Sequence, residues 1–313
     1  MPENKTRRLT QGAMMIVLFT ILLAISTYVP LINIVTVWFV PLPLAWYAAK
    51  YESKFSLAAI AISIILSLLI CGLLALPQAI LFGIVAFIVG YGIRKQKSKG
   101  FLFLSTSLAS LVVISVEYVI AVRFFHMDFI KQMIETARKS YEKSNELTKA
   151  MTGQAPLSSE QIETMINTIQ ISMPTLIILC VFAFAWLMIS VQLPLLRRLG
   201  LNAPKFKPFK DLRLPRAMLW YYLAVLAITL FIKPAEGTFL YVIVLNLSFL
   251  LTILFLIQGI SFIHFIINQK GWPKWTAVVA TILAFPLSSF VTLIGIADLG
   301  FQLRELISDM TRK

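Results

Sequence analysis

The 313-residue chain is 59% hydrophobic and only 13% charged, whereas soluble globular domains carry about 25% charged residues, so a water-soluble fold is excluded. Its apolar runs are long and unbroken, which excludes a transmembrane β-barrel, whose strands alternate apolar and polar residues. The net charge of +14 is concentrated in short connectors between apolar runs, a placement that favours cytoplasmic loops and lipid-surface contact over a nucleic-acid partner. We therefore expect an all-α, polytopic transmembrane helical bundle.

Residues 1–124 are expected to contain spans one to five, at about 11–29, 33–49, 55–75, 77–93 and 101–124. Lys5, Arg7 and Arg8 precede the first apolar run, and no small-x-small cleavage pattern follows it, so we expect a retained first span with a cytoplasmic N-terminus. Pro41 and Pro43 should kink the second span. These features predict a multipass protein of a bacterial plasma membrane.

Residues 125–170 differ from every other connector, because five basic residues are balanced by six acidic ones. Apolar residues recur there at helical spacing, and Ser158 with Gln161 forms a candidate capping box. We expect an extracytoplasmic helical hairpin, hinged near residues 152–156, whose second helix continues into a sixth span at 171–196.

A strongly basic connector is expected at 197–216, where Pro204, Pro208 and Pro215 prevent one continuous helix. Spans seven to nine are expected within 217–297, at about 217–233, 239–267 and 275–297, followed by a mixed-charge helical tail at 298–313. The total is eight or nine spans, because the last apolar region either crosses the membrane or re-enters on the same side. The connector residues expected to contact the membrane surface or a partner protein are Arg197, Arg198, Lys205, Lys207, Lys210 and Arg213.

No catalytic motif is present, and two histidines cannot build a histidine-based metal cluster. We therefore expect no enzyme activity, no catalytic residue, no metal site and no cofactor. Glu117 lies inside the fifth span, where an ionisable group usually faces a protein interior or an aqueous cavity. It is a candidate ligand or proton site; alternatively, it lies in the outer third of the span and reaches water or a neighbouring hydroxyl.

Further candidate ligand-binding residues lie in two other spans. In span eight, Asn246, Gln258 and His264 fall within an arc of about 120°. This polar stripe either lines the route of a polar substrate or joins neighbouring spans by hydrogen bonds. Trp38 and Trp46, which flank the two prolines of span two, are a candidate stacking pair, although tryptophans also form interfacial belts.

Two stretches carry a family resemblance. The segment from Arg8 to Met15, which leads through an apolar span to Tyr28-Val29-Pro30, resembles the start of YybS-type bacterial membrane proteins. The stretch Leu196-Arg197-Arg198-Leu199-Gly200, with its basic continuation to Arg216, resembles the middle of the same family, whose function is unknown.

The first six spans are also distantly similar to the substrate-binding S components of energy-coupling factor vitamin transporters. In that family, small residues four apart on the first helix contact the coupling subunit. Here Gly12 and Ala13 are small, but Ile16 and Val17 stand four residues on, which puts such docking in doubt.

Two hypotheses follow for the function. The first is a membrane protein that binds or moves a small molecule through an S-component-like N-terminal half, with Glu117 at the floor of its cavity and Trp38 as a wall. The second is a non-transporting scaffold or regulator that recruits membrane protein partners through the basic connector and the hairpin. The lipid bilayer is a partner under either hypothesis.

Overall fold

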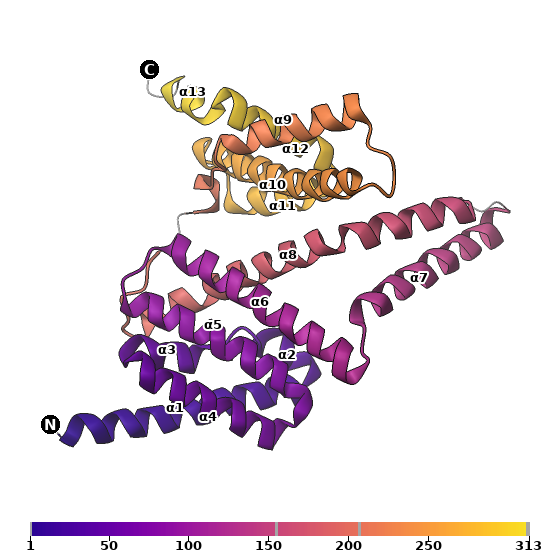
Figure 1. Ribbon diagram of the computed structural model, residues 1–313. Helices are drawn as coiled ribbons and strands as arrows, with labels where there is room; N and C mark the ends of the chain where they lie inside the picture. Colours follow the sequence, from indigo (N-terminus) through magenta and orange to yellow (C-terminus); the bar gives the residue numbers. More distant parts are fainter. Residues whose placement is uncertain (1, 154–155, 206–207, 311–313) are drawn as a thin grey trace. The chain divides into compact units, whose positions relative to one another are not determined.

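The computed structural model describes residues 2–153, 156–205 and 208–310, and every regular element in them is helical (Figure 1). Up to α8 the elements are α1 Pro2–Tyr28, α2 Pro30–Thr36, α3 Leu42–Lys50, α4 Ser53–Cys71, the 3₁₀ turn η1 Leu73–Ala75, α5 Leu76–Arg94, α6 Lys99–Phe125, α7 Phe129–Thr152 and α8 Ser159–Arg198. The rest are the 3₁₀ turn η2 Phe209–Asp211, α9 Ala217–Ala227, the π-helix η3 Ile228–Ile232, α10 Phe239–Gln269, α11 Lys274–Ala284, α12 Ser288–Phe301 and α13 Leu303–Met310. The expectation of an all-α polytopic bundle is confirmed.

Six of these described helices are long and apolar enough to cross a membrane: α1, α4, α5 with η1, α6, α8 and α10. The other three expected spans are short or broken. Residues 33–49 form two short helices separated by a turn, because prolines stand in and beside that turn. Residues 217–232 form a short apolar helix, and α11 and α12 are bent by 113° at a break that contains Pro286. A straight ninth span is thus ruled out by the geometry of residues 274–301.

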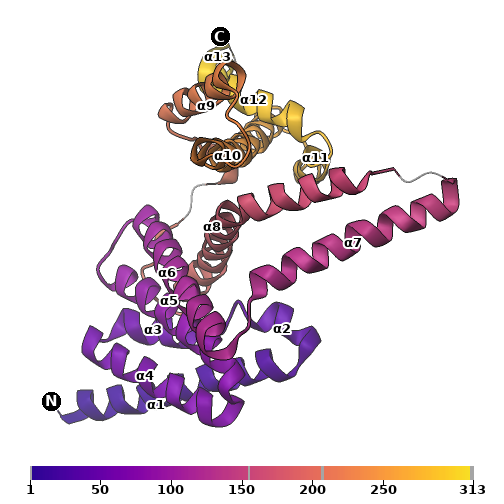
Figure 2. The same cartoon turned by 45° about the vertical axis from the view of Figure 1, so that its right-hand side comes forward.

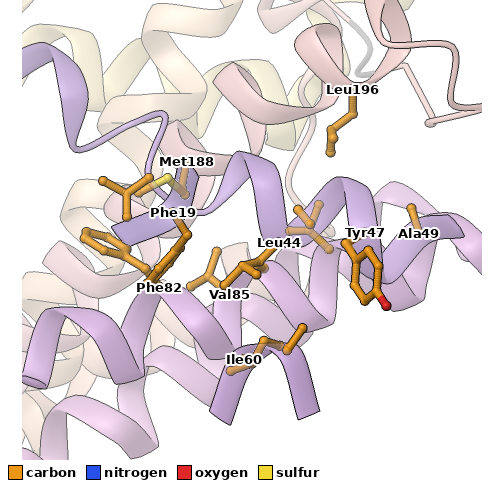
Figure 3. Close-up of a cluster of buried hydrophobic side chains, with 14 of the residues drawn as sticks. Phe19, Leu44, Tyr47, Ala49, Ile60, Phe82, Val85, Met188 and Leu196 are labelled. Atoms are coloured by element: carbon orange, nitrogen blue, oxygen red, sulfur yellow. The ribbon is translucent and has the colours of Figure 1, made fainter. Parts of the chain in front are cut away.

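The chain divides into two compact units, Met1–Phe129 with Ile178–Phe206, and Ile130–Ile177 with Lys207–Lys313. The first unit holds α1 to α6 and the second half of α8. Its core gathers aromatic and aliphatic side chains from α1, α3, α5 and α8, among them Phe19, Leu44, Phe82, Val85 and Met188 (Figure 3). Each of these five is at most 2% exposed. The first unit therefore has a continuous apolar core of its own.

Helix α3 packs closely on α5 because small residues face each other at the contact. A Cβ atom added to Gly90 would lie 2.5 Å from the carbonyl oxygen of Ala45 and 2.5 Å from Cβ of Ala48. These distances are shorter than any van der Waals contact, so only glycine fits at this position. This close contact with α5 holds α3 in place, although α3 is too short to span the membrane alone.

In the second unit, α7 runs beside the first part of α8 (Figure 2). The Asn145 side chain donates to the Leu157 carbonyl at 2.8 Å and accepts from the Leu157 amide at 3.0 Å, and Arg138 forms an ion pair with Glu163. The expected capping box is present, because Ser158 and Gln161 each accept a hydrogen bond from the other's backbone amide. Residues 154–155 of the expected hinge lie outside the described residues.

Helices α10 and α12 pack closely in the second unit through two glycines. A Cβ atom on Gly259 would lie 2.0 Å from the Val291 carbonyl oxygen, and one on Gly295 would lie 2.1 Å from the Phe255 carbonyl oxygen. Both glycines therefore allow backbone-to-backbone approach that no other residue permits. The close contact holds α12 against α10.

Candidate ligand site

One face of α6 carries polar side chains without partners. Thr106 and Ser110 are fully buried, Glu117 is half-buried, and their side-chain oxygens Oγ1, Oγ and Oε1 have no hydrogen-bond partner among the described residues. At 100° per residue the three positions fall within an arc of about 40° and extend over about 16 Å of helix. Leaving a buried polar group unpaired costs about 1–3 kcal/mol, so three on one face need an explanation.

The direction of this face follows from its neighbours on α6. Leu102 contacts α5, where a Cβ atom on Gly92 would lie 2.3 Å from its Cδ2. The Phe103 ring contacts the ring of Phe182 on α8, with 5.8 Å between centroids. On the helical wheel, Thr106 lies between the directions of Leu102 and Phe103. The polar face of α6 therefore points between α5 and α8.

Helix α8 contributes a second unpaired group to the same unit. Gln192 is 0% exposed, and neither its amide oxygen nor its amide nitrogen has a partner among the described residues. It lies on the buried face of α8 between Met188 and Leu196, which both belong to the core of the first unit (Figure 3). Sequence reasoning missed Gln192, although a single glutamine inside an apolar run was a visible signal.

The expected residues of span two contact different neighbours. Trp38 lies in the turn between α2 and α3 and packs on Phe184 of α8, with ring centroids 6.1 Å apart. Trp46 on α3 donates from Nε1 to the Leu199 carbonyl at 3.5 Å, and the Lys50 ammonium lies 4.5 Å from its ring centroid. Trp38 thus lies against the α8 helix that carries Gln192, whereas Trp46 holds the segment that follows α8.

The polar residues of α10 are distributed over separate contacts within the second unit. Asn246 accepts from Thr175 at 2.6 Å and donates to the Ile171 carbonyl at 2.9 Å, which joins α10 to α8. His264 Nε2 lies 2.8 Å from Thr281 Oγ1, which joins α10 to α11. These side chains make interhelical hydrogen bonds, the second of the two interpretations of the α10 stripe.

Gln258, the third expected residue of α10, belongs to a buried network that the sequence did not reveal. Its amide nitrogen donates to Asp298 Oδ2 at 2.6 Å, and its amide oxygen accepts from the Leu214 backbone amide at 3.0 Å. Asp298 also forms an ion pair with Arg304, at 3.0 Å, and both of these side chains are at most 3% exposed. Burial lowers the pKa of the Arg304 guanidinium, and the adjacent Asp298 carboxylate opposes that shift.

The same network holds the basic connector against α10. Arg304 donates to the Lys210 carbonyl at 2.6 Å and to Ser261 Oγ at 3.2 Å. Ser261 Oγ lies within 3.0 Å of the Phe209 and Leu212 carbonyl oxygens. We call Gln258, Ser261, Asp298 and Arg304 the Asp298 network, and it fixes the backbone of residues 209–214.

The basic connector residues have varied surroundings. Arg197 donates to the Pro204 carbonyl at 2.8 Å, Lys210 donates to Asn268 Oδ1, and Arg213 forms an exposed ion pair with Glu305 at 3.1 Å. Arg198 and Lys205 are exposed. Lys207 lies outside the described residues.

The two stretches that carried the family resemblance contact α3 and the residues that directly follow it. Gln11 accepts a hydrogen bond from Tyr51, and the Arg8 guanidinium lies 3.4 Å from the Phe55 ring centroid. A Cβ on Gly12 would lie 3.0 Å from the Tyr47 hydroxyl, so glycine leaves room for that ring. The adjacent Trp46 binds Leu199 of the second stretch. Both stretches therefore stabilise one end of the first unit.

Comparison with known proteins identifies a protein family and a relative of nearly the same length. A family model described as "Predicted membrane protein (DUF2232)" matches residues 17–299. The uncharacterized protein YybS of Bacillus subtilis (strain 168) is 29% identical over 309 residues, which cover 97% of this chain and 99% of that protein. No solved structure matches this chain.

Proposed function

This chain belongs to the DUF2232 family of predicted membrane proteins, and from that premise we propose that its first unit binds a small polar molecule within the membrane. Such binding is the step that a substrate-binding transporter component and a membrane receptor share. We propose a binding protein, because the polar groups of this unit are hydroxyls, an amide and a carboxylate, all of which can hold a ligand by hydrogen bonds.

The observation that carries the proposal is the set of unpaired buried groups in the first unit. Thr106 and Ser110 on α6 and Gln192 on α8 are all 0% exposed, and both helices contribute to one core. A buried amide and two hydroxyls without partners destabilise a fold unless something fills their hydrogen-bonding capacity. A small molecule with several donors and acceptors, bound at the α6 face, meets that requirement for Thr106 and Ser110, and the Glu117 carboxylate favours one that carries a positive charge or donates hydrogen bonds.

The composition of the first unit also supports the proposal. It combines α1, the interrupted α2–α3 pair, α4, α5, α6 and the second half of α8. These are the first six expected spans, the portion that resembles transporter S components. The unit is thus a compact body that could bind a substrate by itself.

The scaffold alternative has less support from the contacts of the connector. Lys210 and Arg213 are engaged by Asn268 and Glu305, and the backbone of the connector is bound by Arg304. Contacts of this kind stabilise the second unit and leave fewer cations for a partner.

The experiment is a thermal-shift screen of the purified full-length protein in detergent against polar vitamins, nucleosides and amino acids. A true ligand raises Tm in proportion to the logarithm of its concentration above Kd. Gln192→Leu and Ser110→Ala should abolish that shift while the proteins remain folded. Gln170→Leu, the same change at an exposed position on α8, should retain it.

The proposal fails if no compound of these classes shifts Tm. It also fails if a compound does so and Gln192→Leu, Ser110→Ala and Glu117→Gln all respond like the unmodified protein. In the second case the ligand would bind elsewhere, and the unpaired groups would have no part in recognition.

A further inference from the structure

The second unit contains a groove between the first part of α8 and α10, and the segment that follows η3 also lines it. Its volume is about 510 Å³, within the range of about 300–1,000 Å³ that small-molecule sites occupy. We call it the α8–α10 groove. It is separate from the polar face of α6, which belongs to the first unit.

One end of the groove carries a cation. Lys233 lines it and directly follows η3, the π-helix Ile228–Ile232. A π-turn holds one residue more than an α-turn and is frequent at functional sites. Lys233 itself has φ 47°, in the left-handed region that lysine rarely adopts, and this conformation ends the helix. It forms no ion pair with any described residue that would neutralise it.

The nearest acidic residue in the sequence does not line this groove. Glu236 lines a neighbouring cavity together with Arg138 and Glu163 of the α7–α8 pair. Lys233 is therefore the charged residue of the α8–α10 groove among the residues that the structure describes. A net positive charge at one end of an otherwise uncharged groove favours an anionic group there.

Hydroxyl groups line the groove from both helices. Ser172 on α8 and Tyr241 and Ser248 on α10 lie along it, and Ser172 is 7% exposed. Thr252 and Thr168 also line it, but each donates its hydroxyl proton to its own helix, at 2.8 Å. Hydroxyl groups of this kind can donate to the oxygens of an acidic head group.

The remaining wall is apolar. Val244, Leu245 and Phe249 line it from α10. From Tyr241 to Thr252 the groove follows α10 for about 16 Å, the length of an alkyl chain of about a dozen carbons. The groove is therefore amphipathic, with its cation near one end and an apolar wall along its length.

Asn246 fixes the two helices that form the groove. It binds α8 through the Ile171 carbonyl and Thr175, directly beside the lining residues Ser172 and Leu245. The walls are thus held apart at a set distance before any ligand arrives, which reduces the entropic cost of binding.

We propose that the α8–α10 groove binds an amphiphile with an anionic head group, the head at Lys233 and the acyl chain along Val244, Leu245 and Phe249. Two kinds of molecule in a membrane have this chemistry: an anionic phospholipid and a free fatty acid. Both provide oxygens for the ammonium group and the hydroxyls, and an apolar chain for the wall. The charge on the head group is the feature that the groove selects.

The test is native mass spectrometry of the full-length protein with added phosphatidylglycerol, phosphatidylcholine of the same acyl chains, or oleate. We expect phosphatidylglycerol or oleate to bind about two- to fivefold more tightly than phosphatidylcholine, because Lys233 is exposed and solvent weakens its attraction for an anionic head group. Lys233→Gln should remove the preference. Lys149→Gln, at an exposed position of α7 in the same unit, should keep it.

The second variant tests the apolar wall. Leu245→Trp should fill the groove and weaken binding of both acidic amphiphiles by about tenfold, with Tm measured to confirm that the protein is folded. Binding of oleate without phosphatidylglycerol, or the reverse, supports the proposal and identifies the source. Equal binding of phosphatidylglycerol and phosphatidylcholine, or a preference for an acidic head that Lys233→Gln leaves intact, overturns it.

Discussion

The Asp298 network of the second unit and Gln192 of the first unit are both deeply buried but differ in their hydrogen bonding. In the second unit, Asp298 accepts from Gln258 and Arg304, and Arg304 donates to Lys210 and Ser261. In the first unit, Gln192 is equally buried and has no partner for either amide atom among the described residues.

Under the proposed function, this difference separates groups that stabilise the fold from groups that bind a ligand. A satisfied network contributes to the fold and is costly to break at one member. An unsatisfied group opposes the fold, and it persists only where something else compensates. The Asp298 network is therefore structural, and the unpaired groups of the first unit are the better functional candidates. Four predictions test this comparison.

The largest effect is expected from Arg304→Met. This change leaves the Asp298 carboxylate buried without its cation, and breaking a buried ion pair costs about 3–5 kcal/mol. Unfolding of the full-length protein by sodium dodecyl sulfate in mixed micelles measures the loss in the free energy of unfolding.

The double variant Asp298→Leu with Arg304→Met is the control. It removes both charges together, so most of the lost stability should return. If the single change costs less than 1 kcal/mol, the Asp298 network is not what stabilises the second unit.

The second largest effect on the free energy of unfolding is expected from Gly259→Ala. Its Cβ would lie 2.0 Å from the Val291 carbonyl oxygen, so α10 and α12 must separate, at a cost of about 1–3 kcal/mol. Gly300→Ala is a matched control, because the nearest atom to its Cβ is a flexible side-chain carbon of Leu219 at 3.7 Å. Equal stability of the two variants in the same unfolding assay would contradict the close packing.

A pair of identical changes compares the units directly. Gln258→Leu leaves Asp298 and the Leu214 amide each short of a partner and should lower the free energy of unfolding by about 1–3 kcal/mol. Gln192→Leu removes an amide that has no partner and should raise it by a similar amount when no ligand is present. The two shifts should differ in sign. Two losses of similar size would show that Gln192 is satisfied in the fold and would remove the basis of the proposed ligand site.

The smallest effect is expected from Arg213→Gln. The Arg213–Glu305 ion pair has both side chains about half exposed, and exposed pairs of this kind contribute about 0–1 kcal/mol. The variant should unfold within 1 kcal/mol of the unmodified protein, and the difference should shrink in high salt. A larger loss would mean that the connector depends on this surface contact as well as on the buried network.

Much of the fold could be predicted because hydropathy is a local property. The apolar runs of α1, α4, α5, α6, α8 and α10 were each visible as about 20 residues or more, and Ser158 with Gln161 marked the start of α8. The number of spans could not be predicted in the same way. Whether Pro41 and Pro43 bend a helix or end it, and whether Pro286 reverses the path of α11, depends on the helices packed around them.

The Asp298 network could not be predicted because its members come from three helices, α10, α12 and α13, and because Asp298 and Arg304 lie in what the sequence indicated as a mixed-charge tail. Asp298 and Arg304 are six residues apart, which on a straight helix places them about 120° apart. Gln302, with φ 54°, ends α12 and allows the chain to turn, so the two charges meet. By contrast, the sequence identified Glu117, because an ionisable residue inside an apolar span is conspicuous. That Thr106 and Ser110 lie on the same face of α6 could also be predicted, from the helical wheel.

The brevity of α3 has a consequence for how the protein is made. Nine residues extend about 14 Å, less than half of a hydrocarbon core of about 30 Å, so α3 cannot enter the bilayer stably while it is the newest segment to leave the ribosome. Its stable position depends on Gly90, which is synthesised about 40 residues later. We therefore expect α3 to reach its stable position only after α5 has been translated.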